Sequence, residues 1–108
     1  MRLAVDQNYE HPLHMKKQFK LTDPKKAPAR QVEAVKFEIR KYLARERRKS
    51  LPAGVDFWNF DCRIGNEKDS ATEIDVSDIN KGIDRLVAQG LEQFYLEILA
   101  KPGYKKKA

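Results

Sequence analysis

The sequence predicts a small α+β domain in which two helices pack on one face of a four-stranded antiparallel sheet. Four segments alternate apolar and polar residues with the period of two that half-buried strands show. Two longer segments repeat apolar residues at helical spacing. Prolines and glycines separate these segments into the order β-α-β-β-α-β. A chain of 108 residues suits one such domain.

The first strand and the first helix are expected at residues 17–21 and 29–49. Lys17, Phe19 and Leu21 alternate with polar residues, and an Asp-Pro turn follows. Pro28 suits the first turn of a helix, where a backbone N–H is not needed. The apolar residues that then recur at helical spacing are Val32, Val35, Ile39, Tyr42 and Leu43. Pro52 and Gly54 lie just beyond the expected end of the helix.

Residues 55–64 and 72–76 are expected to form a hairpin. Trp58, Phe60, Cys62 and Ile64 share one face of the first of these strands, and Phe57, Asn59, Asp61 and Arg63 share the other. The first face must be the buried one, because the second carries the charges. Thr72, Ile74 and Val76 alternate in the partner strand after a polar loop at residues 65–70.

The second helix and the last strand complete the predicted sheet. Ser77 is the expected N-cap, Gly82 indicates a close approach of helix to sheet, and Gly90 suits a left-handed C-terminal cap. In the last strand Phe94, Leu96, Ile98 and Ala100 should point inward, with Tyr95, Glu97 and Leu99 outward. The simplest arrangement is a ferredoxin-like plait with strand order 4-1-3-2.

Three stretches carry a resemblance to a known family: FKLTDPK at 19–25, RRKSLPAGVDFWNFDC at 47–62 and EILAKPG at 97–103. They resemble a small family of proteobacterial proteins classed as a domain of unknown function. The resemblance runs from about Met15 to near the C-terminus, implies a short stand-alone bacterial protein, and carries over no functional residue. We therefore expect an N-terminal extension at 1–14, one domain at 15–104 and a basic tail at 105–108.

The composition excludes several classes of protein. The single cysteine, Cys62, cannot form an internal disulfide, and no apolar run could serve as a signal peptide or a transmembrane helix. A cytoplasmic location fits both observations. The two histidines, His11 and His14, lie in the expected extension, and no glycine-rich phosphate loop, CxxC motif or metal-ligand cluster is present. We expect no catalytic residue, no cofactor and no metal site, and a buried structural role for Cys62.

Charge is the most informative property of the sequence, because it is segregated along the chain. Residues 15–54 have a net charge of +9, residues 55–100 have −6, and the last eight residues have +4. Such asymmetry favours an oriented encounter with a polyanion. The simpler alternative is a solvated surface that keeps the protein soluble.

The predicted nucleic-acid site is the solvent side of the first helix, which presents Lys36, Arg40, Lys41, Arg45, Arg47 and Arg48. Cations that neutralise phosphates release counterions, and arginine can bind phosphate oxygens with a bidentate fork. RNA, or the ribosome, is a better candidate than DNA. We expect no RNA on the open sheet face, where four carboxylates would repel the phosphates.

Two alternatives use the open sheet face. Phe57, Tyr95 and Leu99 are exposed apolar candidates for a homodimer or a protein partner. Asp61, Asp75 and Glu97 could hold Mg²⁺ for a nuclease, although carboxylates at this spacing are ordinary on the wet side of a strand. A membrane-surface role is not expected, because the apolar side of the first helix lacks large insertion residues.

Overall fold

A computed structural model of the chain describes residues 14–106 and confirms the predicted α+β class and element order. Two short 3₁₀ helices, η2 and η3, flank the third strand. The predicted tail is described as far as Lys106, and the predicted extension, apart from His14, lies outside the described residues. The elements are β1 (His14–Lys20), α2 (Pro28–Arg47), β2 (Phe57–Gly65), η2 (Lys68–Ser70), β3 (Thr72–Ile74), η3 (Val76–Asp78), α3 (Ile79–Ala88) and β4 (Gln93–Gly103).

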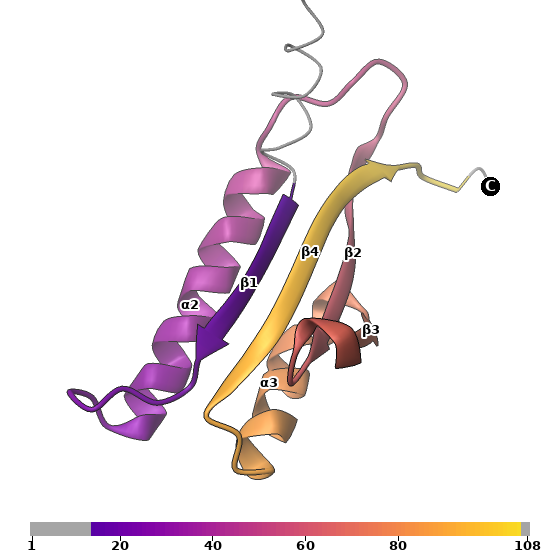
Figure 1. Cartoon of the computed structure of the whole chain (residues 1–108). Helices are drawn as coiled ribbons and strands as arrows, with labels where there is room; N and C mark the ends of the chain where they lie inside the picture. The colour runs from indigo at the N-terminus through magenta and orange to yellow at the C-terminus, as the bar shows by residue number, and fades with distance from the viewer. Residues whose placement is uncertain (1–13, 107–108) are drawn as a thin grey trace, which may run out of the picture.

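The four strands form one antiparallel sheet in the order β1-β4-β2-β3 (Figure 1). The predicted plait order, 4-1-3-2, is therefore wrong. In both orders the two strands that a helix connects, β1 with β2 and β3 with β4, are separated by one strand of the other pair. In the predicted order β3 lies between β1 and β2, whereas in the structure it lies at the edge beyond β2. Both orders permit right-handed connections. The rules of connection alone could not choose between them.

β4 and β2 are the two inner strands, and β4 pairs with β1 on one side and β2 on the other. β4 is also the longest strand, with 11 residues, and residues 94–98 within it are all buried. At the edges lie the lysine-rich β1 and the three-residue β3. Short or lysine-bearing edge strands resist pairing with other chains, whereas an apolar strand gains most from being covered on both sides.

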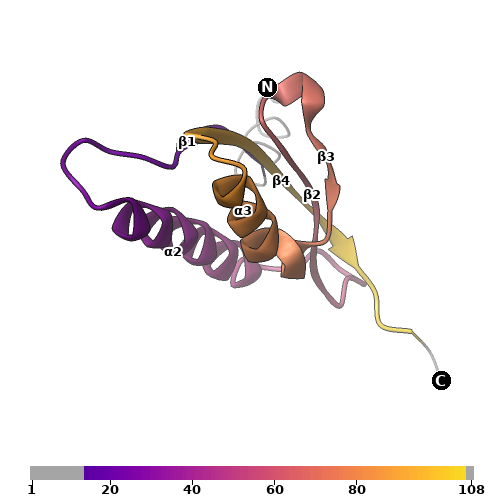
Figure 2. The same cartoon turned by 90° about the horizontal axis from the view of Figure 1, so that it is seen from below.

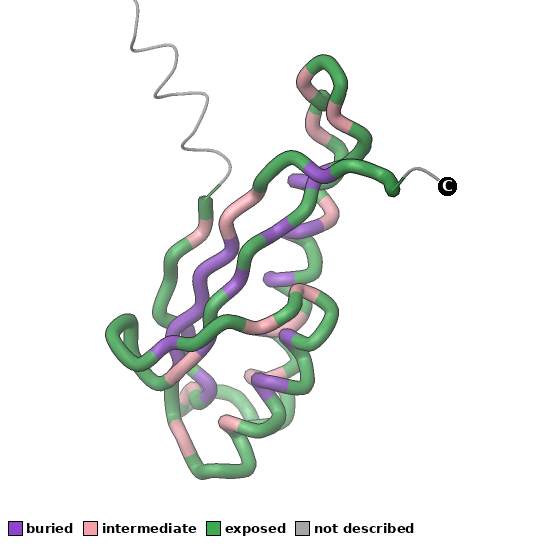
Figure 3. The backbone as a smooth tube through the Cα atoms, turned by 90° about the vertical axis from the view of Figure 1, so that its right-hand side faces the viewer, coloured by how far each residue is buried: buried purple, intermediate pink, exposed green. Residues whose placement is uncertain are grey.

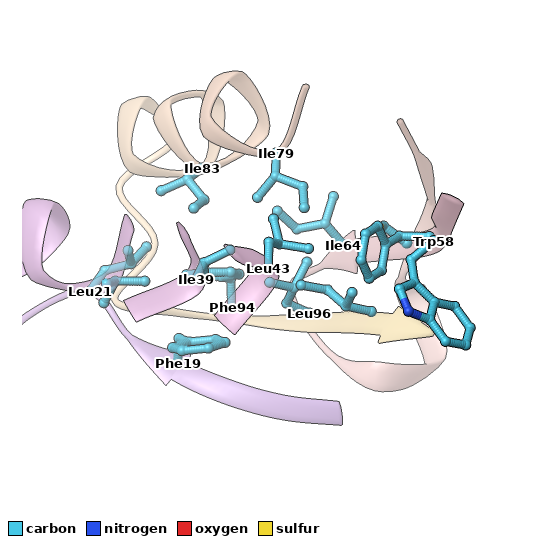
Figure 4. Packing of buried hydrophobic residues seen from close by; sticks show 14 residues of the cluster. Phe19, Leu21, Ile39, Leu43, Trp58, Ile64, Ile79, Ile83, Phe94 and Leu96 are labelled. Atoms are coloured by element: carbon cyan, nitrogen blue, oxygen red, sulfur yellow. The ribbon is translucent and has the colours of Figure 1, made fainter. Parts of the chain in front are cut away.

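Both helices cover the same face of the sheet and enclose the core with it (Figure 2). Along β2 the buried and exposed residues alternate as predicted, which Figure 3 shows as alternating colours of the backbone tube. Figure 4 shows Ile79 and Ile83 of α3 directed toward the same cluster as Ile39 and Leu43 of α2. The strands contribute Phe19, Trp58, Phe60, Cys62, Ile64, Phe94, Leu96 and Ile98.

The ends of α2 are fixed by different devices. At the N-terminus Pro28 occupies the first turn after Ala27, which makes no side-chain cap. At the C-terminus the indole Nε1–H of Trp58 donates to the Lys49 carbonyl oxygen at 3.0 Å. Carbonyl groups at a helix end lack partners within the helix. This bond gives a partner to the Lys49 carbonyl just beyond the last turn and ties that segment to β2. Trp58 is therefore a core residue, at 8 % exposure, that also ties the segment just after the basic helix to the sheet.

The N-terminal end of α3 differs from the prediction. Ser77 is not the cap: η3 precedes α3, and the Asp75 carboxylate accepts from both the backbone N–H and the hydroxyl of Ser77. Gly82 confirms the expected close approach, since a Cβ there would lie 2.8 Å from Cδ1 of Ile74. Gly90, at φ 82°, ends α3 as expected, and the Leu91 N–H donates to the Leu86 carbonyl.

Candidate nucleic-acid interface

Of the six cations predicted to form the site, Lys36 has a structural role. Its Nζ lies 2.6 Å from Asp84 Oδ1 on α3 and 3.8 Å from Glu33 Oε2, and its side chain is only 14 % exposed. The ion pair with Asp84 joins the two helices across their shared boundary. Lys36 is therefore not available to a ligand in the way that the sequence predicts.

The arginines of this region differ from three of its lysines. Lys17, Lys36 and Lys49 are paired with Glu38, Asp84 and Glu46 respectively. Within residues 14–106 no arginine forms an ion pair, including the five on α2 and its C-cap: Arg30, Arg40, Arg45, Arg47 and Arg48. All five are exposed. Their guanidinium groups carry the donors best matched to phosphate.

The last turn of α2 positions two of these arginines. Arg47 extends over Phe60, with 5.3 Å between its Cζ and the ring centroid, and lines the groove between α2 and residues 76–80. Arg48 uses its Nε to donate to the Ala44 carbonyl at 3.2 Å. This bond leaves its two terminal nitrogens for a ligand. Arg47 is therefore oriented toward the groove and Arg48 toward solvent.

A buried glutamate, Glu46, anchors this turn from below through its ion pair with Lys49. Glu46 is 3 % exposed, and its Oε2 lies 2.9 Å from Lys49 Nζ. Burial, together with the negative charge of Glu46, raises the pKa of Tyr42 to about 12. The anchoring groups thus add no exposed negative charge beside the arginines.

Phe37 is a residue of this surface that the sequence analysis did not single out. It is 52 % exposed, and its ring centroid lies 5.5 Å from Cζ of Arg40 and 5.3 Å from Nζ of Lys41. The available signal was its position: it is the large apolar residue on the polar side of an otherwise amphipathic helix. A single exposed apolar residue is ordinary, so the cations beside the ring are what make it of interest.

The exposed residues form a stripe along the side of α2 that faces away from the sheet. Arg30, Phe37, Lys41 and Arg48 follow one another at spacings of seven, four and seven residues. These spacings keep them near one line on a helix of 3.6 residues per turn, which spans about 27 Å from Arg30 to Arg48. Arg40 and Arg45 flank this line on opposite sides. We call Arg30, Phe37, Arg40, Lys41, Arg45 and Arg48 the outer stripe.

On the open sheet face, in contrast, several charged and polar groups are bonded to one another within the fold. Lys101 Nζ lies 2.6 Å from Asp61 Oδ1, the Tyr95 hydroxyl donates to Glu97 Oε2 at 2.9 Å, and Arg63 donates to the Ala71 carbonyl at 2.6 Å. Glu97 and Tyr95 are buried at 7 % exposure each, because β4 has neighbours on both sides. Desolvation, followed by the bond to Glu97, raises the pKa of Tyr95.

The three residues predicted to bind a partner do not form one patch. Tyr95 is buried, Leu99 is half-buried, and Phe57 is 40 % exposed. Phe57 lies opposite Gly103, four residues along β4 from Leu99, which corresponds to about 13 Å. Its ring covers Gly103, where a Cβ would lie 2.2 Å from Phe57 Cε2. Partner binding by this face stays a prediction.

The carboxylates of the nuclease alternative have other roles in the fold. Asp61 pairs with Lys101, and Asp75 accepts from Ser77, whose hydrogen bonds lower the pKa of that carboxyl. In the described part of the chain, no three or more His, Cys, Asp or Glu side chains are grouped closely enough to hold a metal ion. Cys62 is buried, as expected, and burial followed by the charges of Asp61 and Asp75 raises its pKa to about 11.

Comparisons with known proteins identify the family of the chain. Neither helix in residues 14–106 is long and apolar enough to cross a membrane. No curated protein and no solved structure matches the sequence. A family model matches residues 15–108, which agrees with the predicted start of the resemblance at Met15. The chain therefore belongs to the group described as Family of unknown function (DUF6172).

Proposed function

We propose that this protein binds nucleic acid, and RNA in preference to DNA, through the outer stripe of α2. The observation that carries the proposal is that the arginines of α2 are exposed and form no ion pair, whereas Lys36 on the same helix is paired and mostly covered. Charge that the fold has already neutralised cannot attract a polyanion. Unpaired arginines retain their full electrostatic attraction and their donor geometry.

Surface charge elsewhere supports the same orientation. The turn after β1 adds the exposed Lys25 and Lys26 near the N-terminal end of α2, and these form no ion pair in the described part of the chain. Lys16 and Lys20 alternate with the core residue Phe19 and therefore lie on the open face of the sheet. The acidic residues concentrate after residue 55. A polyanion would therefore meet α2 first and be repelled from the open sheet face.

The preference for RNA over duplex DNA follows from how α2 is held. Helices that read duplex DNA project into the major groove and place three or four side chains on base edges. Here α2 lies along one face of the sheet (Figure 2). Its exposed cations follow the helix from Arg30 to Arg48 instead of gathering at one end of it. This arrangement suits phosphates that follow a flexible strand or an irregular RNA surface.

The test compares two triple variants that change the net charge equally. Arg40→Glu, Arg45→Glu and Arg48→Glu reverse the outer stripe, while Lys68→Glu, Lys81→Glu and Arg85→Glu reverse exposed, unpaired cations on η2 and α3. Binding of a labelled RNA is followed by fluorescence anisotropy at two salt concentrations. Because charge-assisted hydrogen bonds contribute about 1.5–3 kcal/mol each, the first variant should lose about 100-fold or more in affinity.

The control variant should lose only a few-fold, and both should keep the wild-type circular dichroism spectrum, because none of these side chains is buried or held in an ion pair in the described chain. Equal losses in the two variants would mean that affinity follows net charge alone. Full retention of RNA by the outer-stripe variant would show that α2 is not the interface.

A further inference from the structure

Phe37 is an aromatic ring exposed without a role in the core. Its 52 % exposure exceeds that of Leu51, Phe57 and Val87, and only Tyr104, near the C-terminus, is a more exposed large apolar residue in the described chain. Phe57 is partly explained by its cover over Gly103. Phe37 has no such partner: its ring contacts are the cations Arg40 and Lys41.

An open hollow adjoins the ring on the side of the N-terminal end of α2. It has a volume of about 560 Å³ and is lined by Lys26, Ala29, Arg30, Glu33, Ala34 and Phe37. The small side chains of the two alanines leave space beside the ring, so that a flat group can approach it from this side. Lys26 and Arg30 are exposed and unpaired, and Glu33 is the single acid of the lining.

The chemistry of these groups specifies what they can hold. Four cations, Lys26, Arg30, Arg40 and Lys41, surround the ring against the single negative charge of Glu33. The occupant must therefore be anionic and must offer a flat face to an aromatic ring. A single-stranded nucleic acid has both properties, because its unpaired bases expose π-faces beside the phosphates. In a duplex those faces are stacked on each other and are not accessible.

We infer that Phe37 is a stacking platform for an unpaired base, and that the flanking cations bind the phosphates on either side of that base. The ligand class of the outer stripe is then single-stranded nucleic acid. This inference rests on the proposed function and sharpens it, because cations alone would not distinguish a strand from a duplex.

The test measures the affinity of the full chain for a labelled single-stranded RNA of roughly 12 nucleotides and for a duplex of the same length. Wild type should bind the single strand more tightly. Phe37→Ala should weaken binding of the single strand about 5- to 150-fold, which is the range found for removing one stacked base contact. Duplex affinity should stay unchanged, and Phe37→Trp, which keeps a stacking surface, should retain the wild-type preference.

The salt dependence separates this inference from the proposal beneath it. Phe37 neutralises no phosphate, so Phe37→Ala should leave the slope of log affinity against log salt concentration unchanged. If wild type binds both RNAs equally, or if Phe37→Ala affects neither, the stacking role is wrong and the electrostatic interface stands. If the wild-type protein binds no RNA, both the stacking role and the proposed electrostatic interface are wrong. If Phe37→Ala instead converts a dimer to a monomer in sedimentation, the ring serves contact between copies, and the stacking role is overturned.

Discussion

The outer stripe of α2 and the open face of the sheet are both wet surfaces with several charged side chains, but they use those charges in different ways. On the open face Lys101 is paired with Asp61, Glu97 is bonded to Tyr95, and Arg63 is bonded to a backbone carbonyl. On the outer stripe the arginines have no acidic partner in the described chain. The first surface stabilises the sheet, and the second retains charge for something outside the molecule.

This difference teaches that counting charges along a helix overestimates a binding site. Six cations were predicted on α2, and the structure shows that they are not equivalent: Lys36 joins α2 to α3, and Arg47 lies over Phe60 beside the groove. The remaining four belong to the outer stripe. A charge becomes informative about ligands once its neighbours are known.

The largest expected effect that sharpens the comparison is salt dependence. If the five cations of the outer stripe each neutralise one phosphate of a single strand, log affinity should fall with log salt with a slope of about −3.5, or roughly 100-fold between about 50 and 200 mM. Arg48→Ala should reduce the magnitude of the slope by about 0.7. Lys101→Ala, which removes a paired cation of the open face, should not change it. Equal changes in the two variants would erase the distinction between the surfaces.

An effect of intermediate size should separate stability from binding. Lys36→Met removes the ion pair between α2 and α3 and should lower the free energy of unfolding by about 0.5–1 kcal/mol, because the Lys36 side chain is mostly covered while Asp84 stays exposed. RNA affinity should stay within a factor of about two. Arg45→Met should lower RNA affinity and leave the free energy of unfolding nearly unchanged. Urea unfolding and anisotropy measure the two quantities, and a loss of RNA affinity in Lys36→Met would return this residue to the binding site.

The smallest expected effect concerns the open face. Gly103→Ala places a Cβ against the ring of Phe57, which must then move; because that ring is 40 % exposed, the cost should stay below about 1 kcal/mol. In a Phe57→Ala background the cost should disappear, which a double-mutant cycle in urea would show as a coupling energy. Additive effects would mean that the ring does not cover the glycine in solution. RNA affinity should be the same in all four proteins of the cycle.

Much of the fold could be predicted from the sequence because local patterns determine it. Alternation identified the inward residues of β2 and β4, and Gly82 and Gly90 occupy the positions that their backbone roles require. Strand order could not be read from the same patterns, since the hairpin can fold to either side of the first unit. The signal that would have decided it was composition: the apolar β4 belongs at the centre and the lysine-bearing β1 at the edge.

The candidate site was predictable only in part. Position on a helical wheel finds the exposed cations, but it cannot show that Asp84, 48 residues further along the chain, meets Lys36. It also cannot show that Tyr95 is covered from both sides once β4 is central. Both facts depend on contacts distant in sequence. Phe37 was predictable as an apolar residue on the polar side of the helix, but its exposure and its neighbouring cations depend on the folded structure.

The hydrogen bond from Trp58 to the end of α2 has a practical consequence. Trp58 is the single tryptophan of the chain, and its indole N–H donates to the carbonyl of Lys49, immediately after the last arginines of the basic helix. The emission of an indole responds to the electric field and hydration around that group. The side chain that ties this end of the helix to the sheet is thus also a native fluorophore hydrogen-bonded to the residue that follows Arg47 and Arg48, so that events at this end of the helix can be followed optically in the unlabelled protein.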